Sequence, residues 1–528
     1  MSDGMVRPIG AAALRAMLLD DRELALLDVR EERIFSESHL LFARSVPLSR
    51  LELRIARLVP RRATRIVLVD DGEGLAERAA RVLGEGGYSD LHILTGGIAA
   101  WAAAGYELFS GVNVPSKAFG EFVEHESHTP SVSAEELNAL MRAGTDMVVL
   151  DSRPYDEYAR VSIPTGVNVP GAELVLRVHD IAPSPGTLVV VNCAGRTRSI
   201  IGAQSLINAG VPNKVVALRN GTMGWNLAGL SCDSGQDRRA PVVSGEGLAF
   251  AKAATDNLAR KLGIARIDES TLARFRAEED RTLYLFDVRD PAEYAAGHVA
   301  GALSAPGGQL VQATDQYAGT LRARIVLVDD REVRAVMTAS WLRQMGWTDV
   351  FVLVAEGRER GYPAAPVLGR APNEAAIGAA ALNDLLMRSD ATVIDLSLSR
   401  RYQEAHIAGA WFAIRARLGH AFGTIRPGGA VVLTSEDGVL ACLAVADARA
   451  LTVQPVHYLE GGNAAWHDSG FALTADDARM ADEPVDAWLK PYERADGGQA
   501  AMAEYLAWET DLLPRIARDG CAKFVALR

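Results

Sequence analysis

A chain of 528 residues is too long for a single hydrophobic core, and we expect about three or four domains. Hydrophobic residues make up 49% of the chain and charged residues 23%, which is typical of a globular protein, and no apolar run is long enough for a transmembrane helix. The net charge of -12 argues against nucleic acid or an anionic membrane as a partner.

The N-terminal residues MSDGMVRPIG lack the apolar stretch of a secretory signal, so we expect a cytoplasmic protein. Four cysteines are scattered along the chain without the spacing of a disulfide framework or a zinc site, which predicts reduced thiols and no bound metal. No glycine-rich nucleotide signature is present, so no cofactor is expected. The cysteines are Cys193, Cys232, Cys442 and Cys521.

A strand that ends in an aspartate recurs four times at whole-domain intervals, and in three copies an arginine follows two positions later. Each copy continues with a helix-like stretch, a second apolar strand and a glycine-rich turn before an aromatic residue. Apolar strands that alternate with amphipathic helices predict α/β units, each with a buried parallel sheet. The first strand ends lie at 26–30, 149–153, 285–289 and 393–397, and the turns that follow contain His39, His298 and His406, which we expect to hydrogen-bond the turn.

The most informative segment runs from Val189 to Ser199. Cys193 follows an apolar strand and precedes a helical pattern that is established by Ile200. Such a loop directs unpaired backbone N–H groups toward its centre, and the helix dipole favours negative charge there. Two arginines within the loop add positive side chains. These features favour a nucleophilic thiolate over a core cysteine.

The Asp-x-Arg strand ends, the Gly-His turns, the cysteine loop and the Gly-Gly-x-x-x-Trp closures together resemble the rhodanese (thiosulfate sulfurtransferase) family. The resemblance implies an α/β fold of four rhodanese-like domains, each a central, mainly parallel sheet flanked by helices, with a helical C-terminal tail. It also suggests two sequential pairs, units one with two and three with four. The domains, called units one to four below, are expected at 5–112, 131–235, 266–368 and 378–475, and the tail, whose apolar positions predict a helix packed on the repeats, at 479–528.

The other three units have a different residue at the position of Cys193. When the units are superposed by their strands, Asp71, Asp330 and Ser435 take the place of the cysteine. A carboxylate cannot accept sulfane sulfur, and a serine without a neighbouring base is a much weaker nucleophile than a thiolate. We therefore expect unit two to be catalytic and the other three to be inactive.

The resemblance implies a thiosulfate sulfurtransferase. Cys193 would take sulfane sulfur from thiosulfate or a similar small anionic donor, carry it as a persulfide, and pass it to a thiol, cyanide or protein acceptor. Arg196 is expected to contact the donor, and Arg198 to orient the loop or the oxyanion. The strand-end residues Asp151 and Arg153 are expected to form an ion pair that braces the loop. The anion would be held by the loop residues Ala194, Gly195, Arg196, Thr197 and Arg198.

Alternatives remain open. A persulfide carrier or protein-binding scaffold with little small-molecule turnover would account for the three degenerate units. A cysteine-dependent phosphatase or arsenate reductase is disfavoured because Cys193 and Arg198 enclose a loop one residue shorter than that of the related phosphatases. Cys232 could act as a resolving thiol for Cys193, whereas Cys442 lies in an apolar helical run and is expected in a core.

Overall fold

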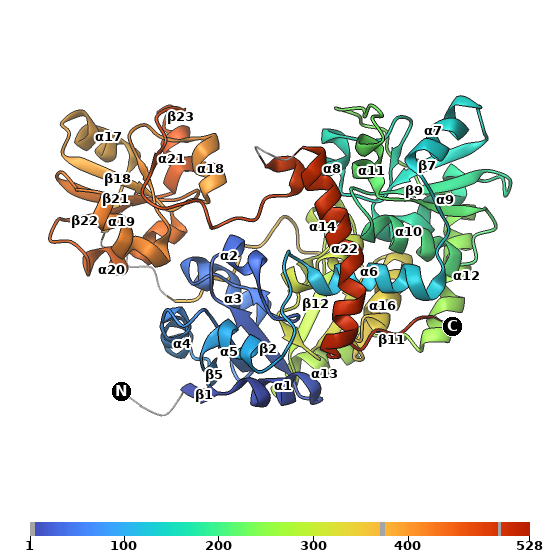
Figure 1. Ribbon diagram of the computed structural model, residues 1–528, viewed down its shortest axis with the longest axis horizontal. Coiled ribbons are helices and arrows are strands. Elements are labelled where there is room, and N and C mark those ends of the chain that lie inside the picture. Colours follow the sequence, from blue (N-terminus) through green and yellow to red (C-terminus); the bar gives the residue numbers. More distant parts are fainter. Residues whose placement is uncertain (1–5, 370–374, 495–497, 528) are drawn as a thin grey trace.

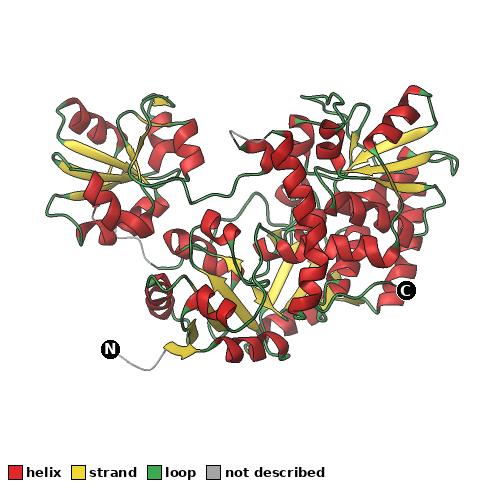
Figure 2. Ribbon diagram, viewed as in Figure 1, coloured by secondary structure: helices red, strands yellow, loops and turns green. Residues whose placement is uncertain are grey.

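The computed structural model describes residues 6–369, 375–494 and 498–527, and it contains four α/β units around a long C-terminal helix (Figure 1). Each unit is a sheet of mainly parallel strands with helices on its faces (Figure 2). The fold predicted from the repeats is therefore confirmed.

Unit one has a sheet in the order β1-β5-β4-β2, with β3 beside β2. The antiparallel strand β14 of unit three extends this sheet at β2, which ties units one and three together. The strands are β1 (Val6–Ile9), β2 (Leu24–Asp28), β3 (Arg44–Ser45), β4 (Arg65–Val69), β5 (Asp90–Leu94) and β14 (Thr320–Leu321), and the helices are α1 (Ala11–Leu19), α2 (Glu32–Glu37), η1 (Leu48–Arg50), α3 (Leu51–Leu58), α4 (Leu75–Glu85) and α5 (Gly97–Ala103).

Unit two has a fully parallel sheet in the order β6-β10-β9-β7-β8. Its central strand β9 carries Val189, Val190 and Val191, all with 0% exposure, because helices cover both faces of a parallel sheet. The strands are β6 (Ser131–Val132), β7 (Met147–Asp151), β8 (Val167–Asn168), β9 (Leu188–Asn192) and β10 (Val215–Leu218), and the helices are α7 (Ala134–Arg142), α8 (Tyr155–Arg160), η2 (Gly171–Glu173), α9 (Leu174–Ile181), α10 (Thr197–Asn208) and α11 (Gly221–Leu227).

Unit three repeats this order as β11-β16-β15-β12-β13. The elements are β11 (Ala265–Ile267), α13 (Glu269–Ala277), β12 (Leu283–Asp287), α14 (Pro291–Ala296), β13 (Leu303–Ser304), α15 (Gly307–Gln312), η3 (Thr314–Gln316), β15 (Arg324–Val328), α16 (Val333–Gln344) and β16 (Val350–Leu353).

Unit four has the order β17-β22-β21-β18-β20-β24, and its last strand comes from the start of the tail. The strands are β17 (Ala376–Ile377), β18 (Ala391–Asp395), β19 (His406–Ile407), β20 (Trp411–Phe412), β21 (Ala430–Thr434), β22 (Val456–Leu459), β23 (Leu473–Thr474) and β24 (Arg479–Met480), and the helices are α17 (Ala379–Met387), α18 (Ser399–Glu404), η5 (Arg415–Arg417), α19 (Leu418–Thr424), α20 (Val439–Arg449) and α21 (Gly462–Asp468).

Three long helices lie outside the repeats: α6 (Val114–Ser127), α12 (Gly245–Leu262) and α22 (Gln499–Asp519). The tail was expected to be helical from 479 onward, but its first part consists of β24, an extended segment and the short helix η6 (Pro491–Glu493). Helix α22 then packs along α6, which in turn packs on α10 of unit two (Figure 1). The tail therefore reaches the unit that carries Cys193.

The pairing of the units differs from the sequential one suggested by the repeats. Unit two packs on unit three through η2 and α15, so closely that a Cβ on Gly308 would lie 3.0 Å from the backbone nitrogen of Gly171. Unit one packs on unit four through η1 and η5, and the Arg415 guanidinium lies 2.9 Å from the Glu52 carboxylate. Equivalent elements thus form both interfaces, which join unit two to unit three and unit one to unit four instead of unit one to unit two and unit three to unit four.

The turn histidines form hydrogen bonds with main-chain carbonyl oxygens near the turn, as predicted. The Nδ1 atoms of His39, His298 and His406 lie 2.9, 3.0 and 2.7 Å from the carbonyl oxygens of Leu40, Tyr294 and Tyr402, respectively. Within the described ranges, none of the helices combines the length and the apolar character needed to cross a membrane. In the same ranges, no group of three or more acidic, histidine or cysteine side chains is arranged to hold a metal ion.

Candidate functional site

Cys193 directly follows β9 and precedes α10, which begins at Thr197. Its side chain is only 2% exposed. The first turn of α10 leaves backbone N–H groups unpaired, and the positive end of the helix dipole faces the loop. The loop therefore lies at the carboxyl end of a central parallel strand, where open α/β sheets place their ligand sites.

The start of α11 determines the shape of the loop. The backbone N–H groups of Thr222 and Met223 donate to the carbonyl oxygens of Cys193 and Ala194 over 2.8 and 2.9 Å. These bonds hold the loop carbonyls toward α11. Gly221 has φ +55°, and a Cβ there would lie 2.3 Å from the Cys193 carbonyl oxygen. Residue 221 must therefore be glycine, because its φ is positive and because the Cys193 carbonyl oxygen leaves no room for a Cβ.

Asp151 and Arg153 form a buried ion pair at the end of β7, with 2.7 Å between Oδ2 and the guanidinium. Burial lowers the pKa of Arg153, but the Asp151 charge outweighs it and the pKa is raised. Arg153 also donates to the Val161 carbonyl over 2.6 Å, and the Asn192 side chain donates to Asp151 over 2.9 Å. The pair thus connects the turn after α8 to the residue before Cys193, a geometry that matches the expected brace.

Arg198 is oriented by a carboxylate. Its guanidinium lies 2.8 Å from Oε2 of Glu157 and also donates to Gln309 of unit three over 3.2 Å. Burial raises the pKa of Glu157, but the charges of Arg198, Lys490 and Arg153 outweigh it and lower the pKa to about 2. Burial lowers the pKa of Arg198, but Glu157 and then Cys193 raise it well above the usual value. Both groups are therefore ionised at neutral pH.

Arg196 forms ion pairs with carboxylates outside the loop. Its guanidinium donates to both oxygens of Glu121 over 2.8 and 2.7 Å, and it also pairs with Glu124 and with Asn220. Both glutamates belong to α6. These pairs attach α6 to the loop, and because Arg196 also lines the cavity at Cys193, its contact with the sulfur donor stays a prediction.

A cavity of about 70 Å³ adjoins Cys193 and the loop. It is closed by residues from outside unit two, which come from α6, from unit three and from the tail. Its small volume suits a compact ligand. Besides the loop residues, the walls include Asn113, Lys117, Glu157, Met223, Gln312, Trp488, Lys490, Pro491 and Tyr505.

A buried polar network connects α6, α22 and the loop. Glu509 of α22 has 0% side-chain exposure, and its Oε1 lies 3.2 Å from Nζ of Lys117 and accepts from the Thr197 hydroxyl over 3.3 Å. Burial lowers the pKa of Lys117, but Tyr505 and Glu509 outweigh it and raise the pKa. Burial and Glu509 raise the pKa of Tyr505. At neutral pH the cavity therefore has a cationic Lys117 and a neutral Tyr505 hydroxyl on its wall.

Sequence reasoning found the loop and missed the residues that close it. The apolar pattern of the tail predicts a packed helix that includes Tyr505, but no motif in the sequence singles out Lys117, Trp488, Lys490 or Glu509. Glu509 follows Tyr505 by one helical turn, and an acidic residue within an otherwise apolar face was the signal that could have indicated a buried polar partner.

In the strand register of the structure, Asp70, Asp329 and Ser435 take the place of Cys193, so the expected Asp71 and Asp330 lie one residue further along the chain. In unit one, the Asp70 carboxylate accepts from the backbone N–H groups of Gly72 and Ala76 over 2.9 and 3.0 Å, and the Arg30 guanidinium contacts both oxygens of the neighbouring Asp71 at 3.0 Å. In unit four, the buried Ser435 hydroxyl accepts from the Ala441 backbone N–H over 3.3 Å.

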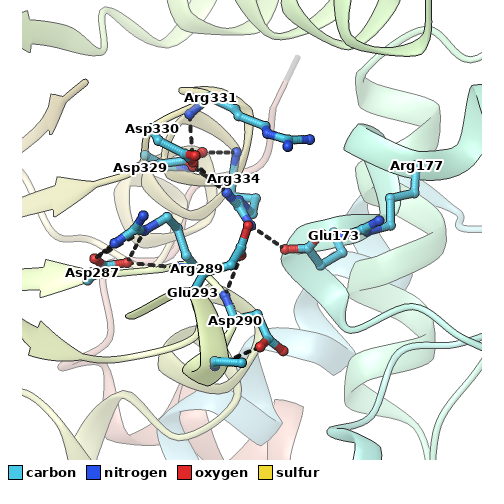
Figure 3. A network of polar contacts seen from close by, with 12 residues as sticks. Glu173, Arg177, Asp287, Arg289, Asp290, Glu293, Asp329, Asp330, Arg331 and Arg334 are labelled. Carbon is cyan, nitrogen blue, oxygen red and sulfur yellow. Dashed lines mark hydrogen bonds and ion pairs between the residues drawn. The ribbon is translucent and has the colours of Figure 1, made fainter. Parts of the chain in front are cut away.

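In unit three, the carboxylate of Asp329 takes this position and is paired with Arg334 (Figure 3). The Arg334 guanidinium lies 2.9 Å from Asp329, 2.7 Å from Asp330, 2.5 Å from Glu293 and 2.8 Å from Glu173, which belongs to unit two. Burial raises the pKa of Asp329 to about 6 despite the arginine. The pKa of Asp330 is lowered, because Asp329 and Arg334 outweigh burial.

The remaining cysteines have other surroundings. Cys442 is buried in the core of unit four, as predicted. Cys232 is half-buried, its Sγ donates to Asn226 over 3.2 Å, and burial raises its pKa. Cys232 does not line the cavity beside Cys193, and its role as a resolving thiol stays a prediction.

Comparison with known proteins gives three findings. The family model of the rhodanese-like domain matches residues 10–104, 133–228, 270–357 and 378–469. A solved structure described as a thiosulfate sulfurtransferase from Pseudomonas aeruginosa is 49% identical, with a TM-score of 0.97 over 99% of this chain and 100% of that one. An HTH-type transcriptional regulator of Mycobacterium tuberculosis is 30% identical over 116 residues, which are 22% of this chain. The chain spans about half the length of that curated relative (48%).

Proposed function

The chain belongs to the rhodanese-like domain family, and from that premise we propose that it is a sulfurtransferase that moves sulfane sulfur from thiosulfate to a thiophilic acceptor through a persulfide on Cys193. One observation carries the proposal. Cys193 is the cysteine at the carboxyl end of a central strand, and its small cavity is lined by the side chains of Lys117, Arg198 and Lys490. Positive side chains around a thiol favour both the thiolate and an anionic donor.

The first half-reaction loads the enzyme. The Cys193 thiolate attacks the outer sulfur of thiosulfate, an S–S bond forms, and the bond between the two donor sulfurs breaks with its electron pair leaving on sulfite. The charge balances, since a dianion and a thiolate become a persulfide anion and a dianionic product. The loop amides and α10 stabilise the persulfide, and Lys117 and Tyr505 can donate hydrogen bonds to the sulfite oxygens.

The second half-reaction transfers the outer sulfur from the Cys193 persulfide to the acceptor. An acceptor such as cyanide attacks the outer sulfur of the persulfide, and the electron pair of the broken S–S bond returns to Sγ as the thiolate. Two half-reactions through a covalent intermediate predict ping-pong kinetics.

The test uses the full chain with thiosulfate and cyanide. Thiosulfate alone is expected to add the mass of one sulfur atom to the Cys193 peptide, and cyanide to remove it with release of thiocyanate. Cys193→Ser should abolish both, while Cys232→Ser, the matched control, should keep both. Thiocyanate release that survives in Cys193→Ser would place the site elsewhere and overturn the proposal.

A further inference from the structure

A second, larger cavity of about 840 Å³ adjoins the one at Cys193. Its walls come from three parts of the chain that are remote in sequence: α2 of unit one, α18 of unit four, and the tail. The two cavities share Trp488, Pro491 and Tyr505, so the tail forms the partition between them. We call this larger cavity the outer chamber.

The partition is held in place by fixed contacts. The rings of Trp488 and Tyr505 lie 6.4 Å apart, and those of Tyr505 and Trp508 lie 5.2 Å apart. The Trp508 indole N–H donates to the Ser110 carbonyl over 3.1 Å. Trp488 and Tyr505 border both cavities, whereas Trp508 borders the outer chamber. A slender group that passes the Trp488 and Tyr505 rings from the outer chamber would arrive at the loop.

The walls of the outer chamber carry charge of both signs. Arg33 and Arg400 face it from units one and four, and Glu37 and Glu493 lie beside them. The pairing of Arg33 with Glu37 is long at 3.9 Å and exposed, and the exposed Arg400 guanidinium lies 3.5 Å from the half-buried Glu493. Such long contacts of an exposed arginine contribute little to stability, so the carboxylate of a ligand can compete for the guanidinium. Side chains of both signs, with aromatic rings between them, match a molecule that carries both carboxylate and ammonium groups.

The size of the outer chamber favours an acceptor larger than cyanide. Cyanide or sulfite needs only the Cys193 cavity, whereas a volume of about 840 Å³ is within the range of pockets that hold a drug-sized ligand. Unit four lacks the nucleophile, yet it supplies Ser399, Arg400 and Gln403 to this wall.

We propose that the outer chamber is the binding site of the sulfur acceptor, a peptide-sized thiol with both carboxylate and ammonium groups, and that unit four serves as a wall of this site. The proposal rests on the proposed function. The acceptor thiolate, its proton released to solvent, attacks the outer sulfur of the Cys193 persulfide. A new S–S bond forms, the old one breaks with its electrons returning to Sγ, and the acceptor leaves as a persulfide.

The experiment uses the full-length protein loaded with thiosulfate and freed of excess donor. Discharge is measured with reduced glutathione as the charged peptide thiol, with 2-mercaptoethanol as an uncharged thiol, and with cyanide. Arg400→Gln is the test variant, and its matched control is Arg401→Gln, which changes a neighbouring α18 arginine paired with Glu404 over 2.9 Å and absent from the chamber wall. Arg400→Gln should raise the glutathione concentration for half-maximal discharge about tenfold, leaving the other two acceptors unchanged.

A binding measurement separates this inference from the chemistry. S-methyl glutathione, which cannot react, should bind the unloaded wild-type protein in calorimetry and bind Arg400→Gln about tenfold more weakly. Equal affinity in the two proteins, or a glutathione discharge in Arg400→Gln equal to wild type, would overturn the acceptor site while leaving the sulfurtransferase function standing. A wild-type protein that loads no sulfur would overturn the proposed function and the acceptor site with it.

Discussion

Replacing Arg334 by methionine would remove the one cation that contacts four carboxylates from two units (Figure 3). Arg334 has 0% side-chain exposure, and methionine keeps much of its length without the charge. Removal of one member of a buried ion cluster leaves uncompensated buried charge, which typically costs about 3–5 kcal/mol. We expect this loss of stability at pH 7, and we expect it at the interface of units two and three, because Glu173 reaches the cluster from unit two.

The expected loss depends on pH. Burial already raises the pKa of Asp329 to about 6 against the charge and hydrogen bond of Arg334, so in Arg334→Met that pKa rises further. A carboxyl whose folded-state pKa is raised destabilises the fold at high pH, and the penalty is relieved as pH falls and the group takes up a proton. Protonating a carboxyl with an ordinary pKa costs about 4 kcal/mol at pH 7 and about 1 kcal/mol at pH 5. The deficit should therefore shrink to about 1–2 kcal/mol at pH 5.

Hydrogen exchange is the appropriate assay because a chain of four units does not unfold in a single two-state transition. The free energy of opening is measured for amides of α16 and α9 at pH 7 and pH 5, with Arg331→Met as the control. Arg331 is next to the same aspartates in sequence, but its side chain points away from the cluster (Figure 3). An Arg334→Met deficit that equals that of Arg331→Met, or that is the same at both pH values, would refute the reasoning.

Two further predictions concern the loop and its cavity. Lys490→Met removes a cation of the cavity wall whose side chain is 37% exposed. We expect the KM for thiosulfate to rise several-fold and to depend less on salt, with no change in protein stability. An unchanged KM in steady-state assays would contradict a role of Lys490 in donor binding. Gly221→Ala places a Cβ against the Cys193 carbonyl oxygen, and we expect it to abolish sulfur loading and to lower stability by about 1–3 kcal/mol in urea melts. Gly229→Ala, at φ +71° with open space around the added atom, is its control and should retain loading.

Much of this protein was predictable from motifs that are local in sequence. The four units follow from repeated strand ends and glycine turns, and the site follows from a cysteine between an apolar strand and a helix. The Asp151–Arg153 pair and the turn histidines were also predicted, because their partners lie within a few residues and local backbone geometry brings them together.

The closure of the site was decided only by the tertiary structure. The apolar face of α22 predicts that the helix is buried, and Glu509 within it indicates a buried polar partner, but nothing in the sequence identifies that partner as Thr197, 312 residues earlier. The same holds for Arg196, whose loop position did not indicate its ion pair with Glu121 of α6, and for the pairing of unit two with unit three. An ionic side chain specifies that it needs a partner of opposite charge, and only the packing of distant elements determines which partner it meets.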